Sequence, residues 1–256
     1  QGTAQYIEEG SYKYIPYNRL YLQTQPVEVT GFGRFEAYAN RDSLSYRKHY
    51  GLEQIPTMLR GTLRMPGYCN AWNIFVKLGW TDDTYRIADS AHLSYNQLLE
   101  AFLPPGKGNL PERLIRFMGA DLQEDSMEKL AWLDVFSDRL TGIENASPAM
   151  ILQHLLEDKW KLRTGDKDMI VMQHRFNYRL NGTAKERISS LVVKGDDPIH
   201  TAMAKTVGLP AAIAAGLILD GVITSKGVQI PTRKEIYAPV MKALAGKGIQ
   251  FTEKES

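Results

Sequence analysis

Three residues with strand-like spacing are the ones in this sequence best suited to bind a charged ligand. In the segment Thr57–Met65, a strand period of two places Arg60, Thr62 and Arg64 on one face. At about 3.3 Å per residue the two arginine Cα atoms lie roughly 13 Å apart, which suits an extended ligand with a carboxylate at each end. Arg41, in an Asn-Arg-Asp turn upstream, supplies a third guanidinium. Because guanidinium groups bind carboxylates in a bidentate way and the threonine adds a neutral hydroxyl, the segment predicts a site for a ligand with several carboxylates.

The same pattern has an explanation that needs no ligand. Arginines at alternate positions are common on the solvent-facing side of an antiparallel sheet, and the pattern alone favours that interpretation. Other chemistry is poorly supported. Gly31 and Gly33 supply two of the three glycines of a dinucleotide fingerprint, but Glu36 stands in the third place and a strand follows instead of a helix. Cys69 opens a predicted helix beside aromatic residues, where we expect a buried, inert thiol.

Composition excludes several function classes. The 31 Lys and Arg residues nearly balance the 29 Asp and Glu residues, so the basic surface that nucleic-acid binding needs is not expected. A single cysteine cannot form an internal disulfide, and with five scattered histidines it cannot build a Cys-rich zinc site. We therefore expect no nucleic-acid partner and no metal.

The sequence also favours a cytoplasmic protein. The longest strongly apolar run, Ala211–Leu219, is shorter than the roughly 20 residues of a membrane span, so no membrane partner is expected. The first ten residues lack the basic and apolar regions of a signal peptide. A chain that begins without Met is consistent with the rear part of a longer protein.

The elements that would position these residues follow a strand, helix, strand order. Strands are expected over residues 5–8, 11–15, 33–39 and 57–65, and short helices fill the stretch from Tyr68 to Trp160, where Ser94 and Gln97 form a capping box. Two long antiparallel strands, 168–180 and 183–194, flank the pair Asn181-Gly182, which tolerates the positive φ of a tight turn.

The last quarter of the chain is predicted to be helical with one closing strand. Asp197-Pro198 is expected to open a helix that Pro210 breaks or kinks, and the apolar segment Ala211–Leu219 is then buried all round or docked on another protein part. Thr232 with Glu235 predicts a capping box before a last helix, and residues 248–252 a strand.

Together these elements predict an α+β fold with a mixed, largely antiparallel sheet, flanking helices and an all-helical inserted domain. Residues 1–66 plus 167–256 form the expected α/β domain, and residues 67–166 the helical insert. The sheet is expected to be discontinuous in sequence.

Four motifs, in order along nearly the whole chain, carry a resemblance to a known family. The sequence resembles saccharopine dehydrogenases of the glutamate-forming type at NRDS (Asn40–Ser43), RGTLR (Arg60–Arg64), GDKDMIVMQH (Gly165–His174) and MAKTVGLPAAIA (Met203–Ala214). The match corresponds to the part of such enzymes that follows their nucleotide-binding domain.

This resemblance implies a function in lysine metabolism. The family carries out NAD(P)-dependent oxidative cleavage of saccharopine, which has three carboxylates, to glutamate and aminoadipate semialdehyde. By correspondence, Arg41, Thr62, Leu63 and Arg64 bind the substrate. Leu63 points to the other side of its strand, so its contact would be made by the backbone. Catalytic and cofactor-binding residues would lie upstream, so we expect none in this chain.

The resemblance also implies partners. An N-terminal Rossmann domain is expected to dock on the helices of residues 198–256, NAD or NADP to bind the full-length enzyme and not this chain, and a homodimer to form. The chain alone would be inactive. Two alternatives stay open: a non-catalytic dimerisation or ligand-sensing module of the same fold, and a related dehydrogenase with another amino-acid or polyamine substrate.

Overall fold

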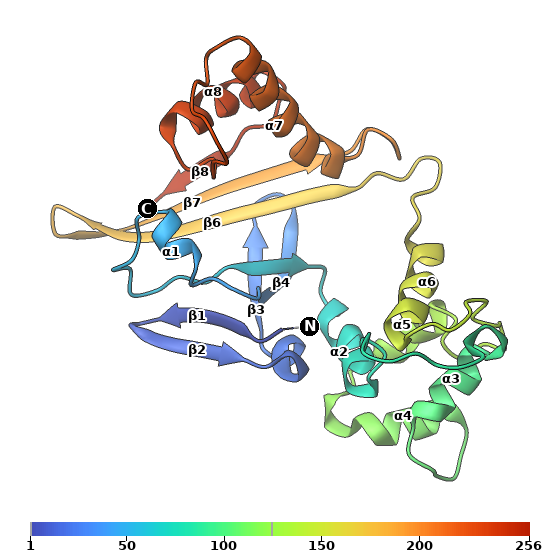
Figure 1. Cartoon of the computed structure of the whole chain (residues 1–256). Coiled ribbons are helices and arrows are strands. Elements are labelled where there is room, and N and C mark those ends of the chain that lie inside the picture. The colour runs from blue at the N-terminus through green and yellow to red at the C-terminus, as the bar shows by residue number, and fades with distance from the viewer. Residues whose placement is uncertain (1, 124) are drawn as a thin grey trace. The chain divides into compact units, whose positions relative to one another are not determined.

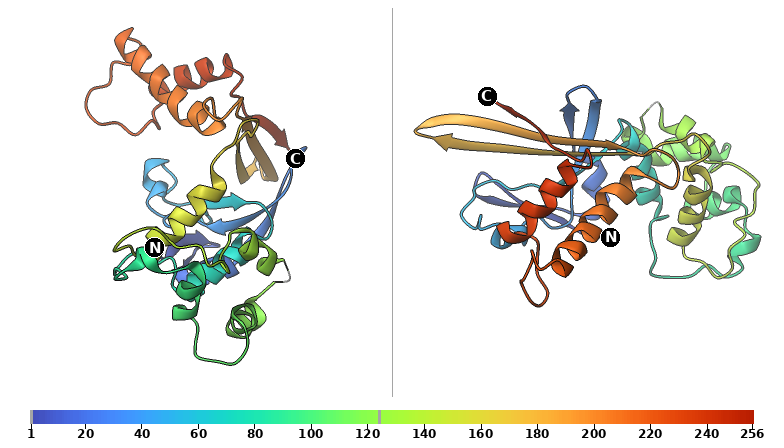
Figure 2. Two further views of the ribbon diagram at one scale, coloured as in Figure 1. Left: turned by 90° about the vertical axis from the view of Figure 1, so that its right-hand side faces the viewer. Right: turned by 90° about the horizontal axis from the view of Figure 1, so that it is seen from above.

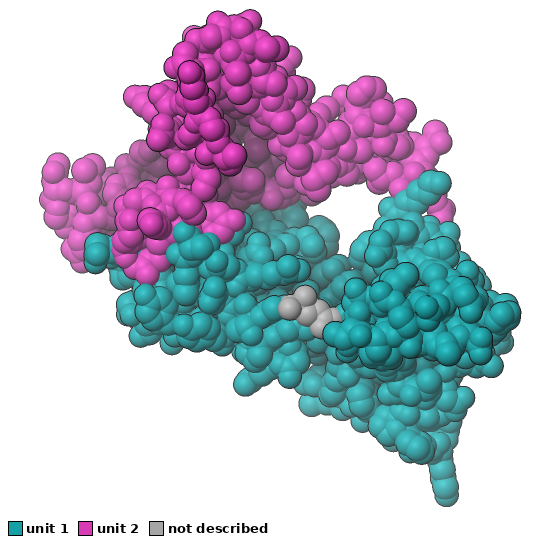
Figure 3. All heavy atoms as spheres, in the orientation of Figure 1, with its two compact units in different colours: residues 1–45, 54–161 teal, residues 46–53, 162–256 magenta. Residues whose placement is uncertain are grey.

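The computed structural model describes residues 2–123 and 125–256, which form two compact units (Figure 3). One unit comprises the described residues up to Ser45 together with Gln54–Lys161, and the other comprises Tyr46–Glu53 with Leu162–Ser256. Helices occur with antiparallel strand pairs, so the predicted α+β class is confirmed. Among the described residues, however, the strands form three separate sheets and not one discontinuous sheet.

The first unit begins with two small sheets. Strands β1 (Ala4–Glu8) and β2 (Ser11–Ile15) form the expected hairpin, and a second sheet contains β3 (Thr24–Val29), β4 (Gly33–Ala39) and β5 (Gly61–Arg64) in that order. A 3-10 helix, η1 (Tyr17–Leu22), connects β2 to β3. Isolated bridges pair β1 with the segments that follow β4 and precede β5, because Gln5 pairs with Asp42 and Ile7 with Met58.

The strand that carries the predicted arginines is shorter than the sequence indicated. Residues 57–60 are not part of β5, because their backbone bonds other partners. Ser43 Oγ accepts the backbone N–H of Arg60 at 2.9 Å, and Met58 exchanges backbone hydrogen bonds with Ile7. The prediction was wrong here because these partners are distant in sequence, and a local strand pattern carries no information about them.

The helical part of the first unit surrounds one apolar core. Its helices are α2 (Tyr68–Leu78), α3 (Tyr95–Phe102), α4 (Leu110–Met118), α5 (Ser126–Trp132) and α6 (Pro148–Trp160), with 3-10 turns η2 (Ser90–His92) and η3 (Gly119–Asp121). The predicted capping box of Ser94 and Gln97 is confirmed. Trp80, Tyr95 and Leu155 are fully buried in the core. Burial of several such side chains, each worth about 1.5–3 kcal/mol, fixes the positions of α2 and α6.

The second unit contains a long hairpin (Figure 1). Strands β6 (Met169–Leu180) and β7 (Thr183–Lys194) pair along their whole length, with β8 (Thr252–Glu255) beside β7. Asn181 and Gly182 have φ of 51° and 83°, the left-handed values expected for this turn. Short helix α1 (Tyr46–His49) belongs to the same unit.

Helices α7 (Ala202–Leu219) and α8 (Lys234–Ala245) lie side by side in this unit (Figure 2). Neither begins where the sequence predicted. The Asp197 carboxylate accepts backbone N–H groups of Ile199 and His200 in a turn before α7, whose own first N–H groups bond Asp168 from the β6 side. At α8, the N-cap residue is Arg233, and its side chain makes no capping hydrogen bond. The Glu235 carboxylate accepts a hydrogen bond from the Ser225 hydroxyl instead, so the predicted capping box is absent.

Helix α7 also differs from the prediction in length and burial. It continues through Pro210 for 18 residues, so of the predicted break or kink the break is absent. By length and composition it is the one helix in the described residues that could cross a membrane, but a core helix of a soluble protein passes the same test. Only 6% of this helix is buried within the structure, so the alternative of burial all round is wrong.

Candidate functional site

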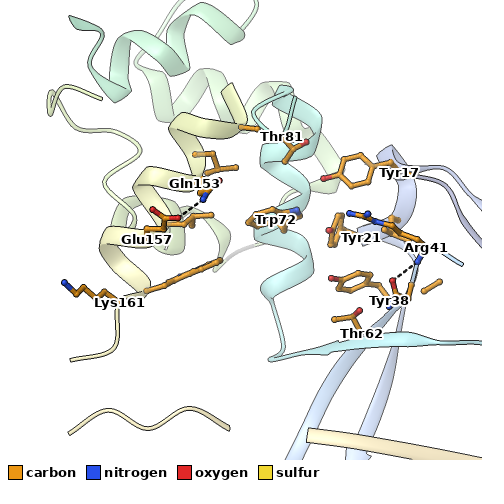
Figure 4. Close-up of a pocket in the computed structure, with 18 residues that line it drawn as sticks. Tyr17, Tyr21, Tyr38, Arg41, Thr62, Trp72, Thr81, Gln153, Glu157 and Lys161 are labelled. Atoms are coloured by element: carbon orange, nitrogen blue, oxygen red, sulfur yellow. Dashed lines mark hydrogen bonds between the residues drawn. The ribbon is translucent and has the colours of Figure 1, made fainter. Parts of the chain in front are cut away.

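A cavity of about 1030 Å³ lies within the first unit (Figure 4). It has the size of a small-molecule site, since such sites commonly enclose about 300–1,000 Å³. One wall is formed by η1 and the ends of β4 and β5, and another by α6, with Trp72 of α2 between them. The aromatic and polar side chains that line it include Tyr17, Tyr21, Tyr38, Asn40, Arg41, Thr62, Trp72, Gln153, Glu157, Trp160 and Lys161.

Hydrogen bonds fix the backbone of Arg41, whereas its guanidinium is available to a ligand. Its N–H donates to Asn40 Oδ1 at 2.7 Å, and its carbonyl accepts the N–H of Gln5 at 2.9 Å. The next residue, Asp42, accepts the N–H groups of Leu44 and Ser45, which fixes the turn. No hydrogen bond or ion pair of the guanidinium is found among the described residues. A cation in a cavity with its donors unused is suited to bind a carboxylate.

The Asp42 carboxylate stabilises this turn in its charged form. Hydrogen bonds from Ser45 are the main cause that lowers its pKa below the usual value, with a further bond from the Leu44 N–H. Charge on Asp42 therefore favours the conformation that presents Arg41 to the cavity.

Thr62 lines the same cavity as Arg41, and the strand register explains its orientation. Thr62 is paired with Tyr38 across β4 and β5, so both side chains project to the same face. This places a hydroxyl next to an aromatic ring in the same wall. The predicted pair of Arg41 and Thr62 is therefore brought together by the structure.

Arg64 and Leu63 are placed differently. Neither is part of the cavity lining. The Arg64 guanidinium lies 5.1 Å from the centre of the Tyr68 ring, and its Nη1 donates to the Leu63 carbonyl at 3.2 Å. Burial raises the pKa of Tyr68 to about 12, although the neighbouring arginine acts in the opposite direction. Arg64 thus has contacts of its own next to the site.

The aromatic wall was not predicted from the sequence. Tyr21 and Tyr38 have ring centroids 4.8 Å apart, and Trp72 is 6.3 Å from Tyr21. Burial, followed by its tyrosine neighbours, raises the pKa of Tyr21 above its usual value, so its hydroxyl is neutral at physiological pH. The sequence gives only a weak signal for this wall, because tyrosines at positions 17, 21 and 38 come from two separate elements.

Helix α6 also contributes lining residues that the sequence did not indicate. Gln153, Glu157 and Trp160 face the cavity with Lys161, which follows the helix. Gln153 Nε2 donates to Glu157 Oε1 at 2.6 Å. Spacing of three and four residues places them on one helical face, but that pattern is equally typical of a solvent-facing helix.

Cys69 lies next to the site and is buried. It has no exposed surface, and its N–H donates to Glu36 Oε1 at 2.6 Å. Burial, with the Glu36 charge as the second cause, raises the pKa of the thiol. The expectation of a buried thiol is confirmed, and a raised pKa makes it a poor nucleophile.

No group of three or more His, Cys, Asp or Glu side chains that could hold a metal is found in residues 2–123 and 125–256. Gly31 lies in the turn between β3 and β4 and Gly33 begins β4, with φ of 80° and 101°. Because β4 and not a helix follows, this turn lacks the helix N-terminus that binds a pyrophosphate, so these residues do not fit a dinucleotide.

Comparisons with known proteins agree on one family. The family model described as the saccharopine dehydrogenase C-terminal domain matches residues 1–249. Saccharopine dehydrogenase [NADP(+), L-glutamate-forming] of Saccharomyces cerevisiae is 31% identical, over 99% of this chain and 58% of its own length. The mitochondrial alpha-aminoadipic semialdehyde synthase of Bos taurus is 37% identical, over 85% of this chain and 24% of its own length.

A solved structure gives the same result for the fold. The apo histidine-tagged saccharopine dehydrogenase (L-Glu forming) from Saccharomyces cerevisiae matches with a TM-score of 0.83 and 30% identity, over 99% of this chain and 59% of that chain. The chain therefore spans about a quarter of the bovine relative and less than two thirds of the yeast one.

Proposed function

Because this chain belongs to the saccharopine dehydrogenase C-terminal domain family, we propose that it forms the substrate-binding and dimerisation part of a saccharopine dehydrogenase-like oxidoreductase. The proposed reaction is the NAD(P)-dependent oxidative cleavage of saccharopine to glutamate and aminoadipate semialdehyde. The observation that carries the proposal is the guanidinium of Arg41, which has no partner among the described residues, in a cavity of about 1030 Å³ that Thr62 also lines. A substrate with three carboxylates needs such a cation.

Each predicted site residue has a specific role in this proposal. Arg41 binds one carboxylate through two parallel N–H bonds, and the Thr62 hydroxyl donates a hydrogen bond to the same ligand. Arg64 acts from the side of Tyr68, where its charge attracts a second carboxylate. Leu63 contributes only backbone groups.

The cofactor belongs to the remainder of the enzyme in this proposal. The yeast relative is named for NADP(+), whereas the one glycine turn resembling a fingerprint here does not fit a dinucleotide. We therefore expect that the chain alone binds neither NAD nor NADP and is inactive. Its own residues bind and orient the substrate.

The second unit supplies the proposed partner surface. Several large apolar side chains of α7 are exposed, and they include Met203, Val207, Ile218 and Leu219. Exposed apolar surface of this kind is typical of an interface. An N-terminal Rossmann domain covers it in the proposal, and the protein is a homodimer of cytoplasmic location, although the bovine relative is named as mitochondrial. The proposal retains the α/β domain of residues 1–66 plus 167–256 with its helical insert.

Titration of the chain with saccharopine by isothermal calorimetry tests the proposal. We expect weak binding, and a loss on the order of 2–4 kcal/mol in Arg41→Ala if the carboxylate pair is desolvated. Arg19→Ala is the matched control, because Arg19 is exposed and lies outside the cavity lining. Equal affinities of the two variants would refute the assigned site.

A further inference from the structure

Helix α6 has an apolar face buried in the core and a polar face that lines the cavity. Ile151 and Leu155 have no exposed surface and pack in the helical core. Gln153, Glu157 and Trp160 lie on the face that lines the cavity. The core contacts hold the helix in position, so the polar face is a fixed wall of the cavity and not a mobile surface.

The charged groups at the end of α6 divide according to the face on which they lie. Asp158 pairs with Arg139 at 2.7 Å, and Lys159 pairs with Asp134 at 2.7 Å, both away from the cavity lining. Glu157 and Lys161, which line the cavity, have no ion pair among the described residues. Among the described residues, the Glu157 side chain accepts one hydrogen bond, from Gln153 Nε2 to Oε1. This bond leaves Oε2 available to a ligand.

These groups complete a charge pattern that Arg41 begins on the opposite wall (Figure 4). The cavity then has a cation, Arg41, on one wall and a carboxylate, Glu157, on the other, whereas the Lys161 side chain extends away from Arg41. An amino-dicarboxylic acid has the complementary groups, a carboxylate for the cation and an ammonium group for the carboxylate. The glutamate portion of saccharopine is such a group, with its nitrogen protonated at neutral pH.

We propose that Glu157 binds the ammonium group of an amino-dicarboxylic ligand, one carboxylate of which lies at Arg41. The inference rests on the proposed function, because Arg41 anchors the ligand in both. It assigns to the helical part of the chain a direct role in substrate recognition. The aromatic wall excludes water from one side of the ligand.

The test compares two ligands that differ only in the ammonium group. L-glutamate and glutarate are titrated into the wild-type chain and into Glu157→Gln, and the ratio of the two dissociation constants is followed. We expect the preference for glutamate to fall about three- to tenfold in Glu157→Gln, since a charge-assisted hydrogen bond at a partly exposed site is lost. Glu144→Gln, an exposed change of the same charge outside the lining, should leave the ratio unchanged.

A further variant separates this inference from the proposed function. Arg41→Ala should weaken both ligands by a similar factor. If Arg41→Ala weakens both ligands while Glu157→Gln leaves their ratio unchanged, the ammonium site is refuted and the proposed function stands. If the wild type binds neither ligand, the ammonium site is refuted and the saccharopine titration decides the proposed function. If Arg41→Ala has no effect on either ligand or on saccharopine, both are refuted. Circular dichroism confirms that each variant is folded.

Discussion

Arginines in or next to antiparallel strands have different charged neighbours in the two units. In the second unit, Arg187 of β7 pairs with Glu255 and with Glu253 at 3.6 Å, and Arg175 of β6 lies 3.5 Å from Glu186. In the first unit, Arg41 follows β4 and has no side-chain partner among the described residues. The sheet arginines satisfy their charges within the protein, whereas the cavity arginine leaves its charge for a ligand. Residue type and strand position alone do not distinguish the two cases.

Charge reversal should give the largest contrast between the units. Arg41→Glu places a carboxylate where we expect the ligand carboxylate, and like charges in contact cost several kcal/mol, so saccharopine binding should fall by about 100-fold or more. Arg187→Glu adds a third carboxylate beside Glu253 and Glu255, so it should lower the melting temperature and leave binding unchanged. Calorimetric titration and thermal melts of both variants measure these effects. The comparison would be contradicted if Arg187→Glu lost saccharopine binding while Arg41→Glu kept it.

Arg64→Ala should have an intermediate effect. The RGTLR motif predicts a direct substrate contact, but Arg64 lies over Tyr68 and outside the cavity lining. We expect saccharopine binding to weaken about tenfold, less than in Arg41→Ala, because the charge acts from the side of the site. The same titration measures it. A loss larger than that of Arg41→Ala would show that the side chain turns into the cavity when the ligand binds.

Acid should weaken the turn that presents Arg41. The folded-state pKa of Asp42 is lowered, so its contribution to stability is present above the usual value of 3.8 and is lost as the pH falls through the lower folded value. Asp42→Ala should lower the melting temperature by about 2–4 °C at pH 7. The difference from wild type should then shrink below about pH 4. Melts from pH 7 to pH 2 check this, and a constant difference would argue against the role of the charge.

The smallest effect is expected at an ion pair of the second unit. Arg175 and Glu186 are both partly exposed, and such pairs contribute about 0–1 kcal/mol. Arg175→Ala should change the free energy of unfolding by less than about 0.5 kcal/mol and should not alter ligand binding. Urea unfolding measures the first quantity. A large destabilisation would show that the sheet depends on its charges more than the comparison assumes.

Local signals in the sequence predicted the local structure well. The Asn181-Gly182 hairpin and the Ser94 capping box depend on residues close in sequence, and both are confirmed. Local signals gave wrong predictions where a group distant in sequence competes for the same hydrogen bonds. The Asp168 carboxylate takes the first N–H groups of α7, so Asp197 forms a turn instead of a helix start.

The candidate site was predictable only on one side. Arg41 and Thr62 lie on adjacent strand ends, and pattern and motif both indicated them. The wall formed by Gln153 and Glu157 was not indicated, because their approach to Arg41 depends on how the helical core packs against α2. Periodicity identifies the buried face of a helix, but it does not reveal what lies opposite its polar face.

A crystal structure of the chain with bound saccharopine tests the central claim most directly. The account predicts the ligand in the cavity of the first unit, with one carboxylate in bidentate contact with Arg41 and the Thr62 hydroxyl within hydrogen-bond distance. Saccharopine bound at another surface, with the guanidinium of Arg41 free of it, would contradict the account.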